Sequence, residues 1–127
     1  MADITSYLED AAHFPGGHAA AIVFPRTLVE AADAVRSAGA VLAIGAQSSL
    51  TGGATPMGEC LISTARLDRI LDHSAETVTV QAGVTIEALQ QFLAEHDAWF
   101  PPAPTFTGAT AGGVVATNAA GAATFKY

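Results

Sequence analysis

Apolar and polar positions in the first third of the chain predict a strand, a helix and a second strand. Residues 22–25, Ile-Val-Phe-Pro, are typical of a short buried strand stopped by proline. Residues 27–30, Thr-Leu-Val-Glu, match a capping box, which predicts a helix over 28–38 that ends at Gly39. The uninterrupted apolar run Val41–Ile44 then indicates a fully buried strand.

The middle of the chain has the composition of two further strands, at residues 60–63 and 77–82. In the second, apolar and polar side chains alternate, which places the valines and Ala82 on one face. Residues 66–71 between them fit a turn of helix or an irregular link. A short helix followed by a turn is expected within residues 3–18.

The last third begins with Thr85, which can cap a helix over 86–96. The apolar residues at helical spacing that should face inward are Ile86, Leu89, Phe92 and Leu93. Residues 99–105 should be extended, because each proline fixes its own φ and pushes its predecessor out of the α region. With the glycine-rich stretch 108–121, the pattern predicts an α+β fold with an α/β-like order, a small parallel-containing sheet and flanking helices.

Composition and charge narrow the possible partners. The chain has 127 residues, of which 50% are hydrophobic and 13% charged, so it should form one domain or part of one. Its net charge of −7 offers no positive surface, and we expect neither nucleic acid nor a membrane surface as a partner. Cys60 is the only cysteine and no HExxH spacing occurs, so neither an internal disulfide nor a metal site is expected.

Residues 1–4, Met-Ala-Asp-Ile, lack the basic and apolar parts of a signal peptide. No apolar run approaches the roughly 18 residues that a membrane span requires. We therefore expect a cytoplasmic protein without a transmembrane segment.

Two glycine-rich segments have the character of anion-binding backbone. Residues 45–53 follow a predicted strand, and glycines and small hydroxyl residues there leave amides free to converge on a phosphate. Residues 107–118 end in a pattern that could begin a helix, whose first amides would add partial positive charge. Together the segments could hold a diphosphate without lysine or arginine. The residues alone leave simple turns as the commoner interpretation, and they match neither a Walker loop nor a GxGxxG fingerprint.

The chain resembles the FAD-binding PCMH-type domain of the vanillyl-alcohol-oxidase superfamily, in particular its branch of glycolate oxidase and D-lactate dehydrogenase. The resemblance covers roughly residues 22–127 and rests on five ordered blocks, Val41–Gly58, Ser63–Ile70, Val80–Val84, Phe100–Pro104 and Ala109–Ala119. It implies FAD as cofactor. A generic nucleotide-binding domain unrelated to flavins would require all five blocks to be coincidence.

The resemblance also implies which residues bind the cofactor. The first segment would wrap the FAD pyrophosphate with its backbone and shape the turn through Gly45, Ala46, Gln47, Ser48, Ser49, Leu50 and Gly52. The second would hold the other side and line the cofactor through Gly108, Ala109, Thr110, Gly112, Gly113, Val115 and Ala116. Some relatives tether the flavin through a histidine near the position of Gln47. Because an amide is not nucleophilic enough for this, FAD should be bound non-covalently at Gln47. Ala103 replaces an acidic residue common in the family, so a polar contact near the flavin should be missing.

The activity implied is that of an FAD-dependent oxidoreductase, which transfers hydride from an α-hydroxy acid or similar alcohol to flavin N5. The family's substrate-orienting groups lie in a cap domain C-terminal to this region, so the catalytic residues are unknown. The family's FAD domain continues past residue 121, and we expect residues 1–127 to be an incomplete, by itself inactive domain, from a truncated product or an excised fragment. The substrate and the electron acceptor would bind to the missing region, which would be a cap domain or a second chain. The alternative is a non-catalytic fragment that binds FAD weakly or serves as an interaction module.

Overall fold

A computed structural model describes residues 3–127, so Met1 and Ala2, on which the signal-peptide expectation partly rests, lie outside the described residues. The chain divides into two compact units: unit 1 ends at Arg66, and unit 2 comprises Leu67–Tyr127. The prediction that residues 1–127 form one incomplete domain stays a prediction.

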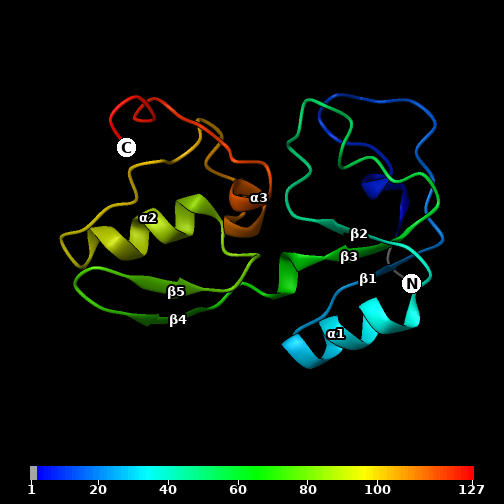
Figure 1. The fold of residues 1–127 in the computed structure, drawn as a ribbon, viewed down its shortest axis with the longest axis horizontal. Helices are drawn as coiled ribbons and strands as arrows, with labels where there is room; N and C mark the ends of the chain where they lie inside the picture. Colours follow the sequence, from blue (N-terminus) through cyan, green and yellow to red (C-terminus); the bar gives the residue numbers. More distant parts are fainter. Residues whose placement is uncertain (1–2) are drawn as a thin grey trace. The chain divides into compact units, whose positions relative to one another are not determined.

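Unit 1 is built on a three-stranded parallel sheet in the order β1-β3-β2 (Figure 1). The strands are β1 (Ala21–Val23), β2 (Val41–Ile44) and β3 (Cys60–Ser63). Leu61 of the central strand pairs with β1 on one side and β2 on the other, and its side chain is fully buried. The predicted fold class, with its parallel-containing sheet, is confirmed.

The predicted full burial of Val41–Ile44 is wrong, because β2 is an edge strand. Only Ile44 is buried, whereas Val41 is 39% exposed. An apolar run does not distinguish an edge strand from a central one, and here β3 takes the centre. The strand predicted at 22–25 ends earlier, at Val23, so that Pro25, which has no amide to donate, lies outside the ladder.

Helix α1 (Leu28–Ser37) begins where the capping pattern predicts (Figure 1). The Glu30 amide donates to the Thr27 hydroxyl at 3.1 Å. The Glu30 carboxylate accepts from the Arg26 amide at 2.7 Å, one residue before the usual partner of a capping box. None of the residues of α1 is buried. The expected short helix near the N-terminus is the 3-10 turn η1 (Thr5–Tyr7), and a second such turn, η2 (Thr64–Arg66), ends the unit.

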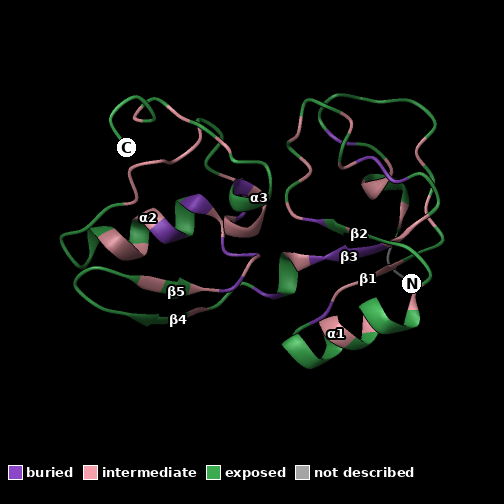
Figure 2. Cartoon of the chain, in the orientation of Figure 1, coloured by how far each residue is buried: buried purple, intermediate pink, exposed green. Residues whose placement is uncertain are grey.

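Unit 2 packs helix α2 (Ile86–Ala94) on an antiparallel hairpin of β4 (Ile70–His73) and β5 (Val78–Val80) (Figures 1 and 2). The core joins Val84, Ile86, Leu89 and Val114. The predicted inward face is confirmed, since Ile86 and Leu89 are buried and Phe92 and Leu93 half-buried. The Ala88 amide donates to the Thr85 hydroxyl at 3.1 Å, which confirms the cap.

Strand β4 was not predicted, because its apolar residues Ile70 and Leu71 are adjacent rather than alternate. Leu71 is 54% exposed, and the pairing with β5 is irregular between Ile70 and Asp72. Strand β5 is shorter than the predicted 77–82. Gln81 lies beyond its end, buried, and its side-chain oxygen accepts from the Arg69 amide at 3.0 Å.

The last helix along the described chain is α3 (Ala111–Ala116), within the stretch where a helix was expected. Residues 99–105 contain a turn at Pro101–Pro102 and are therefore not extended throughout. Across residues 3–127, no helix combines the length and the apolar character that crossing a membrane requires.

Candidate functional site

The glycine-rich loop Gly45–Gly53 follows directly after β2 in unit 1. Its turn is held by the Thr51 amide, which donates to the Ser49 hydroxyl at 3.3 Å. Gly52 has a φ of +78°, and a Cβ atom there would lie 3.1 Å from the Phe14 ring. Both the left-handed backbone and the close ring require glycine at this position.

The backbone of this loop carries unpaired donors. Within the described part of the chain, the amides of residues 46–50 donate no hydrogen bond. Ala46, Ser48 and Leu50 are exposed, so these amides are open to water or to a bound anion. The loop has no charged side chain of its own. It is therefore suited to bind an anionic group through neutral amides.

Gln47 holds the loop against the N-terminal segment rather than presenting a free side chain. Its Nε2 atom donates to the carbonyls of Tyr7 at 3.0 Å and Ala54 at 2.8 Å. Its own carbonyl accepts from the Ala11 amide at 2.9 Å. Its φ is +49°, a left-handed value that is uncommon for residues other than glycine and asparagine. Three hydrogen bonds therefore stabilise an unfavourable backbone conformation.

Asp10 is a residue of this region that the sequence did not reveal. Its side chain is 3% exposed. One carboxylate oxygen accepts from the Ala12 amide at 3.1 Å, and the other from the Ala54 amide at 3.3 Å. The Asp10 amide donates to the Thr55 hydroxyl at 3.2 Å. The contact with Ala12 is a local turn pattern that a sequence can suggest. The contacts with Ala54 and Thr55, which are 44 and 45 residues away, cannot be predicted from a local pattern.

The second predicted segment lies in unit 2, around the start of α3. The amides of Ala111 and Gly112 donate to the carbonyls of Val84 at 2.8 Å and Ala82 at 2.9 Å. The Gly113 amide donates to the Thr110 hydroxyl at 3.2 Å. These amides already donate hydrogen bonds within unit 2, so a cofactor would have to contact other backbone or side-chain groups of the segment.

Other parts of the second segment are open. Val115 is 82% exposed, and Ala116 is exposed as well. Among the described residues, the Gly108 amide has no hydrogen-bond acceptor. A Cβ atom at Gly112 would lie 2.8 Å from the Cβ of Ala82, so this glycine permits close packing within unit 2. The cofactor contacts of the segment stay a prediction.

The possible metal ligands of residues 3–127 lie scattered rather than clustered. The histidines at 13, 18, 73 and 96 are all exposed. Among residues 3–127, no group of three or more His, Cys, Asp or Glu side chains could hold a metal ion. Near the end of the first loop, the Met57 amide donates to the Glu59 carboxylate at 2.6 Å and lowers the pKa of Glu59.

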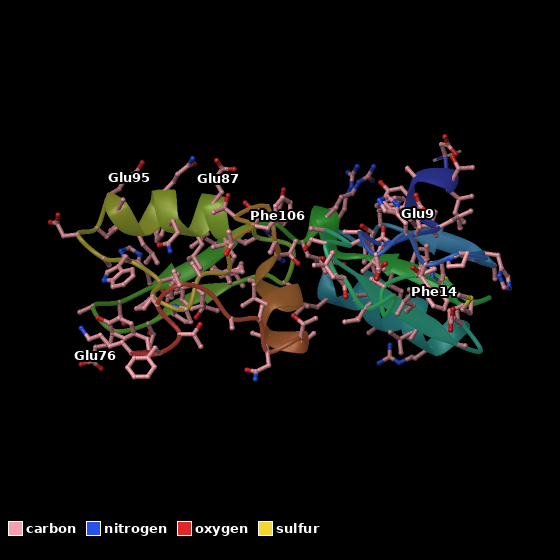
Figure 3. The ribbon with its side chains drawn as sticks, turned by 90° about the horizontal axis from the view of Figure 1, so that it is seen from above. Glu9, Phe14, Glu76, Glu87, Glu95 and Phe106 are labelled. Atoms are coloured by element: carbon pink, nitrogen blue, oxygen red, sulfur yellow. The ribbon has the colours of Figure 1, made fainter. Side chains whose placement is uncertain are left out.

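An open cavity of about 280 Å³ lies in the N-terminal segment of unit 1. Glu9 and Phe14, which help to line it, both come from this segment (Figure 3). None of the residues predicted to bind a cofactor lines it.

Comparisons with known proteins agree with this fold. A family model described as FAD binding domain matches residues 19–127. The chain is 38% identical over 86 residues to a D-lactate dehydrogenase of Anaerostipes hadrus, covering 65% of this chain and 18% of that protein. It is 36% identical over 115 residues to a D-2-hydroxyglutarate dehydrogenase of Xanthomonas citri pv. viticola, covering 84% and 24%.

Solved structures with this fold include an alkyldihydroxyacetonephosphate synthase, at a TM-score of 0.72 and 21% identity over 84% of this chain and 22% of that one. Cholesterol oxidase from B. sterolicum aligns at a TM-score of 0.63 and 23% identity, covering 80% and 21%. The chain therefore spans about a fifth of the length of the D-lactate dehydrogenase and of these two structures.

Proposed function

Since the chain belongs to the FAD-binding domain family, we propose that the Gly45–Gly53 loop binds the diphosphate of FAD through its backbone. The observation that carries this proposal is the run of unpaired amides at residues 46–50, of which Ala46, Ser48 and Leu50 are exposed residues. Several N–H groups can converge on phosphate oxygens where side chains are small. The residues present therefore fit the group, with Gly45, Ala46, Gln47, Ser48 and Ser49 as contacts and Leu50 and Gly52 shaping the turn.

The second segment is proposed to contribute further contacts to FAD through Gly108, Ala109, Thr110, Gly112, Gly113, Val115 and Ala116. Support comes from the family resemblance and from the exposure of Val115 and Ala116. Because the amides of Gly112 and Gly113 are paired within unit 2 and a Cβ atom at Gly112 would meet Ala82, we assign these glycines an indirect role, in which close packing at the start of α3 positions the neighbouring residues that contact the cofactor.

FAD is proposed to be held without a covalent bond at Gln47. A carboxamide is a poor nucleophile, and the Gln47 Nε2 atom is already engaged by two backbone carbonyls. Its role is therefore to shape the loop.

The whole protein is proposed to be a flavin-dependent oxidoreductase, glycolate oxidase-like in branch, that acts on an α-hydroxy acid such as D-lactate or D-2-hydroxyglutarate. Support comes from the relatives named D-lactate dehydrogenase and D-2-hydroxyglutarate dehydrogenase. When bound, FAD accepts a hydride at flavin N5. Residues 1–127 are proposed to bind the cofactor, and a cap domain or a second chain is proposed to bind the substrate and the electron acceptor. A cytoplasmic location is proposed from the sequence features alone.

Titration of the purified 127-residue chain with FAD, followed by flavin fluorescence, tests the binding proposal. FMN, which lacks the diphosphate, and ADP, which lacks the flavin, serve as comparators. Saturable FAD binding that is tighter than binding of either comparator is expected. A folded chain that binds none of the three would contradict the proposal and leave the second candidate function, that of a non-catalytic interaction module.

A further inference from the structure

The N-terminal segment, residues 3–18, precedes the part of the chain that matches the family, which begins at residue 19. It nevertheless forms hydrogen bonds near the start of the Gly45–Gly53 loop and just beyond its end. Near the start of the loop, the Ala11 amide donates to the Gln47 carbonyl at 2.9 Å. Just beyond the end of the loop, the Ala54 amide donates to the Asp10 carboxylate at 3.3 Å. The segment therefore closes the loop from outside.

The contacts continue past the loop. The His18 amide donates to the Pro56 carbonyl at 3.0 Å, and the Gly58 amide donates to the His18 carbonyl at 2.8 Å. The segment also folds tightly on itself, since a Cβ atom at Gly17 would lie 1.6 Å from the Leu8 carbonyl oxygen. Residues 3–18 are thus tied to residues 47–58 at several points rather than at one.

Two side chains connect the segment to the loop. Gln47 bridges the carbonyls of Tyr7 and Ala54, and its left-handed φ turns the chain near the start of the run of unpaired amides. Asp10 is buried, and each of its carboxylate oxygens accepts from a backbone amide. Removing either side chain would leave partly buried backbone groups without their protein partners, which favours rearrangement of the surrounding loop.

We propose that residues 3–18 act as a clamp that holds the Gly45–Gly53 loop in the conformation that binds a diphosphate, with Asp10 and Gln47 as its positioning residues. This inference rests on the proposed function, because it assigns the clamp a role at that same site. Neither side chain needs to touch the cofactor. The clamp acts by fixing the directions of the amides of residues 46–50 before the ligand arrives, which lowers the ordering cost of binding.

The test uses the 127-residue chain and two variants. Gln47→Gly removes the side-chain bonds while glycine accepts the left-handed φ. Asp10→Asn keeps the size of the side chain but replaces one acceptor oxygen with a donor. The matched control is Asp33→Asn, the same change at an exposed carboxylate of α1 that pairs with Arg36. Circular dichroism restricts the comparison to conditions in which each variant is folded.

Two readouts are combined: amide hydrogen exchange of residues 46–54 without ligand, and the Kd for FAD from flavin fluorescence. We expect both variants to exchange faster at Ala54 and to bind FAD about tenfold more weakly, the effect of losing about one charge-assisted or bridging hydrogen bond. The control should match the wild type in both. Unchanged exchange at the Ala54 amide, or wild-type FAD affinity in both variants, would overturn the clamp. A wild-type chain whose Ala54 amide is protected but which does not bind FAD would contradict the proposed function instead.

Discussion

The side-chain amide of Gln47 lies 2.8 Å from the carbonyl oxygen of Ala54, seven residues later, and closes the glycine-rich loop across its base. The same nitrogen donates to Tyr7 at 3.0 Å. The side-chain nitrogen of a residue that the family resemblance places at the cofactor is thus engaged in holding the loop. This relationship favours a flavin that is bound by the backbone and not by this side chain.

We therefore expect FAD to be released when the loaded chain is denatured. If FAD is held without a covalent bond at Gln47, as proposed, precipitation with acid should leave the yellow flavin in the supernatant and a colourless protein pellet. Flavin fluorescence retained by the chain on a denaturing gel would contradict this expectation.

Gly112 should be sensitive to the smallest substitution. A Cβ atom there would lie 2.8 Å from Ala82 Cβ and 3.1 Å from the Ala82 carbonyl oxygen. Overpacking costs about 1–3 kcal/mol, and the helix preference of alanine returns about 1 kcal/mol at most. Gly112→Ala should therefore lower the free energy of unfolding in urea. Gly39→Ala is the control, because a Cβ atom there meets nothing within 4 Å, and a similar loss in both variants would refute the packing argument.

The buried central strand should dominate the stability of unit 1. Leu61 is 0% exposed, so Leu61→Ala should cost about 2–5 kcal/mol in the free energy of unfolding. Leu50 in the glycine-rich loop is 79% exposed, and Leu50→Ala should change stability by less than about 0.5 kcal/mol. Urea denaturation of the two variants checks the contrast, and equal effects would mean that β3 is not the core of this unit.

The hydrogen bond between the Met57 amide and the Glu59 carboxylate should be lost when acid protonates the carboxylate. Its pKa is lowered from 4.5, chiefly by the hydrogen bond from the Met57 amide. Since the pKa of the folded state lies below that of the unfolded state, this bond stabilises the fold above pH 4.5 and its contribution is lost as the pH falls through the lowered value.

Nuclear magnetic resonance can follow this titration at the Met57 amide. We expect its chemical shift to change with a midpoint below pH 4.5, and Glu59→Gln to abolish the change. A midpoint at or above 4.5 would show that the carboxylate does not hold this turn.

Local patterns predicted most of the elements, because capping and hydrophobic periodicity act over a few residues. The caps at Thr27 and Thr85 and the inward face of α2 are such features. The exposed edge position of β2, the strand β4 and the burial of Asp10 depend on partners distant in sequence. Asp10, for example, meets Ala54 44 residues away, and no local pattern specifies that contact.

The glycines of the two segments illustrate the same limit. Composition indicated backbone open to an anion in both segments, and the unpaired amides at residues 46–50 fit that expectation. At the start of α3, however, the amides of Ala111 and Gly112 pair with residues 84 and 82. A glycine-rich sequence does not reveal whether its amides are free or already bonded.

If the amides of residues 46–50 bind the diphosphate of FAD, a negative charge placed among them should weaken binding, and a matched pair of charge substitutions measures this. Ala40 precedes β2 and Ala46 follows it, and both are exposed. Ala46→Glu would place a negative charge at the proposed phosphate site and should weaken FAD binding by about tenfold or more, whereas Ala40→Glu should leave the Kd nearly unchanged. If both variants titrate with FAD as the wild type does, the diphosphate is not bound at this loop.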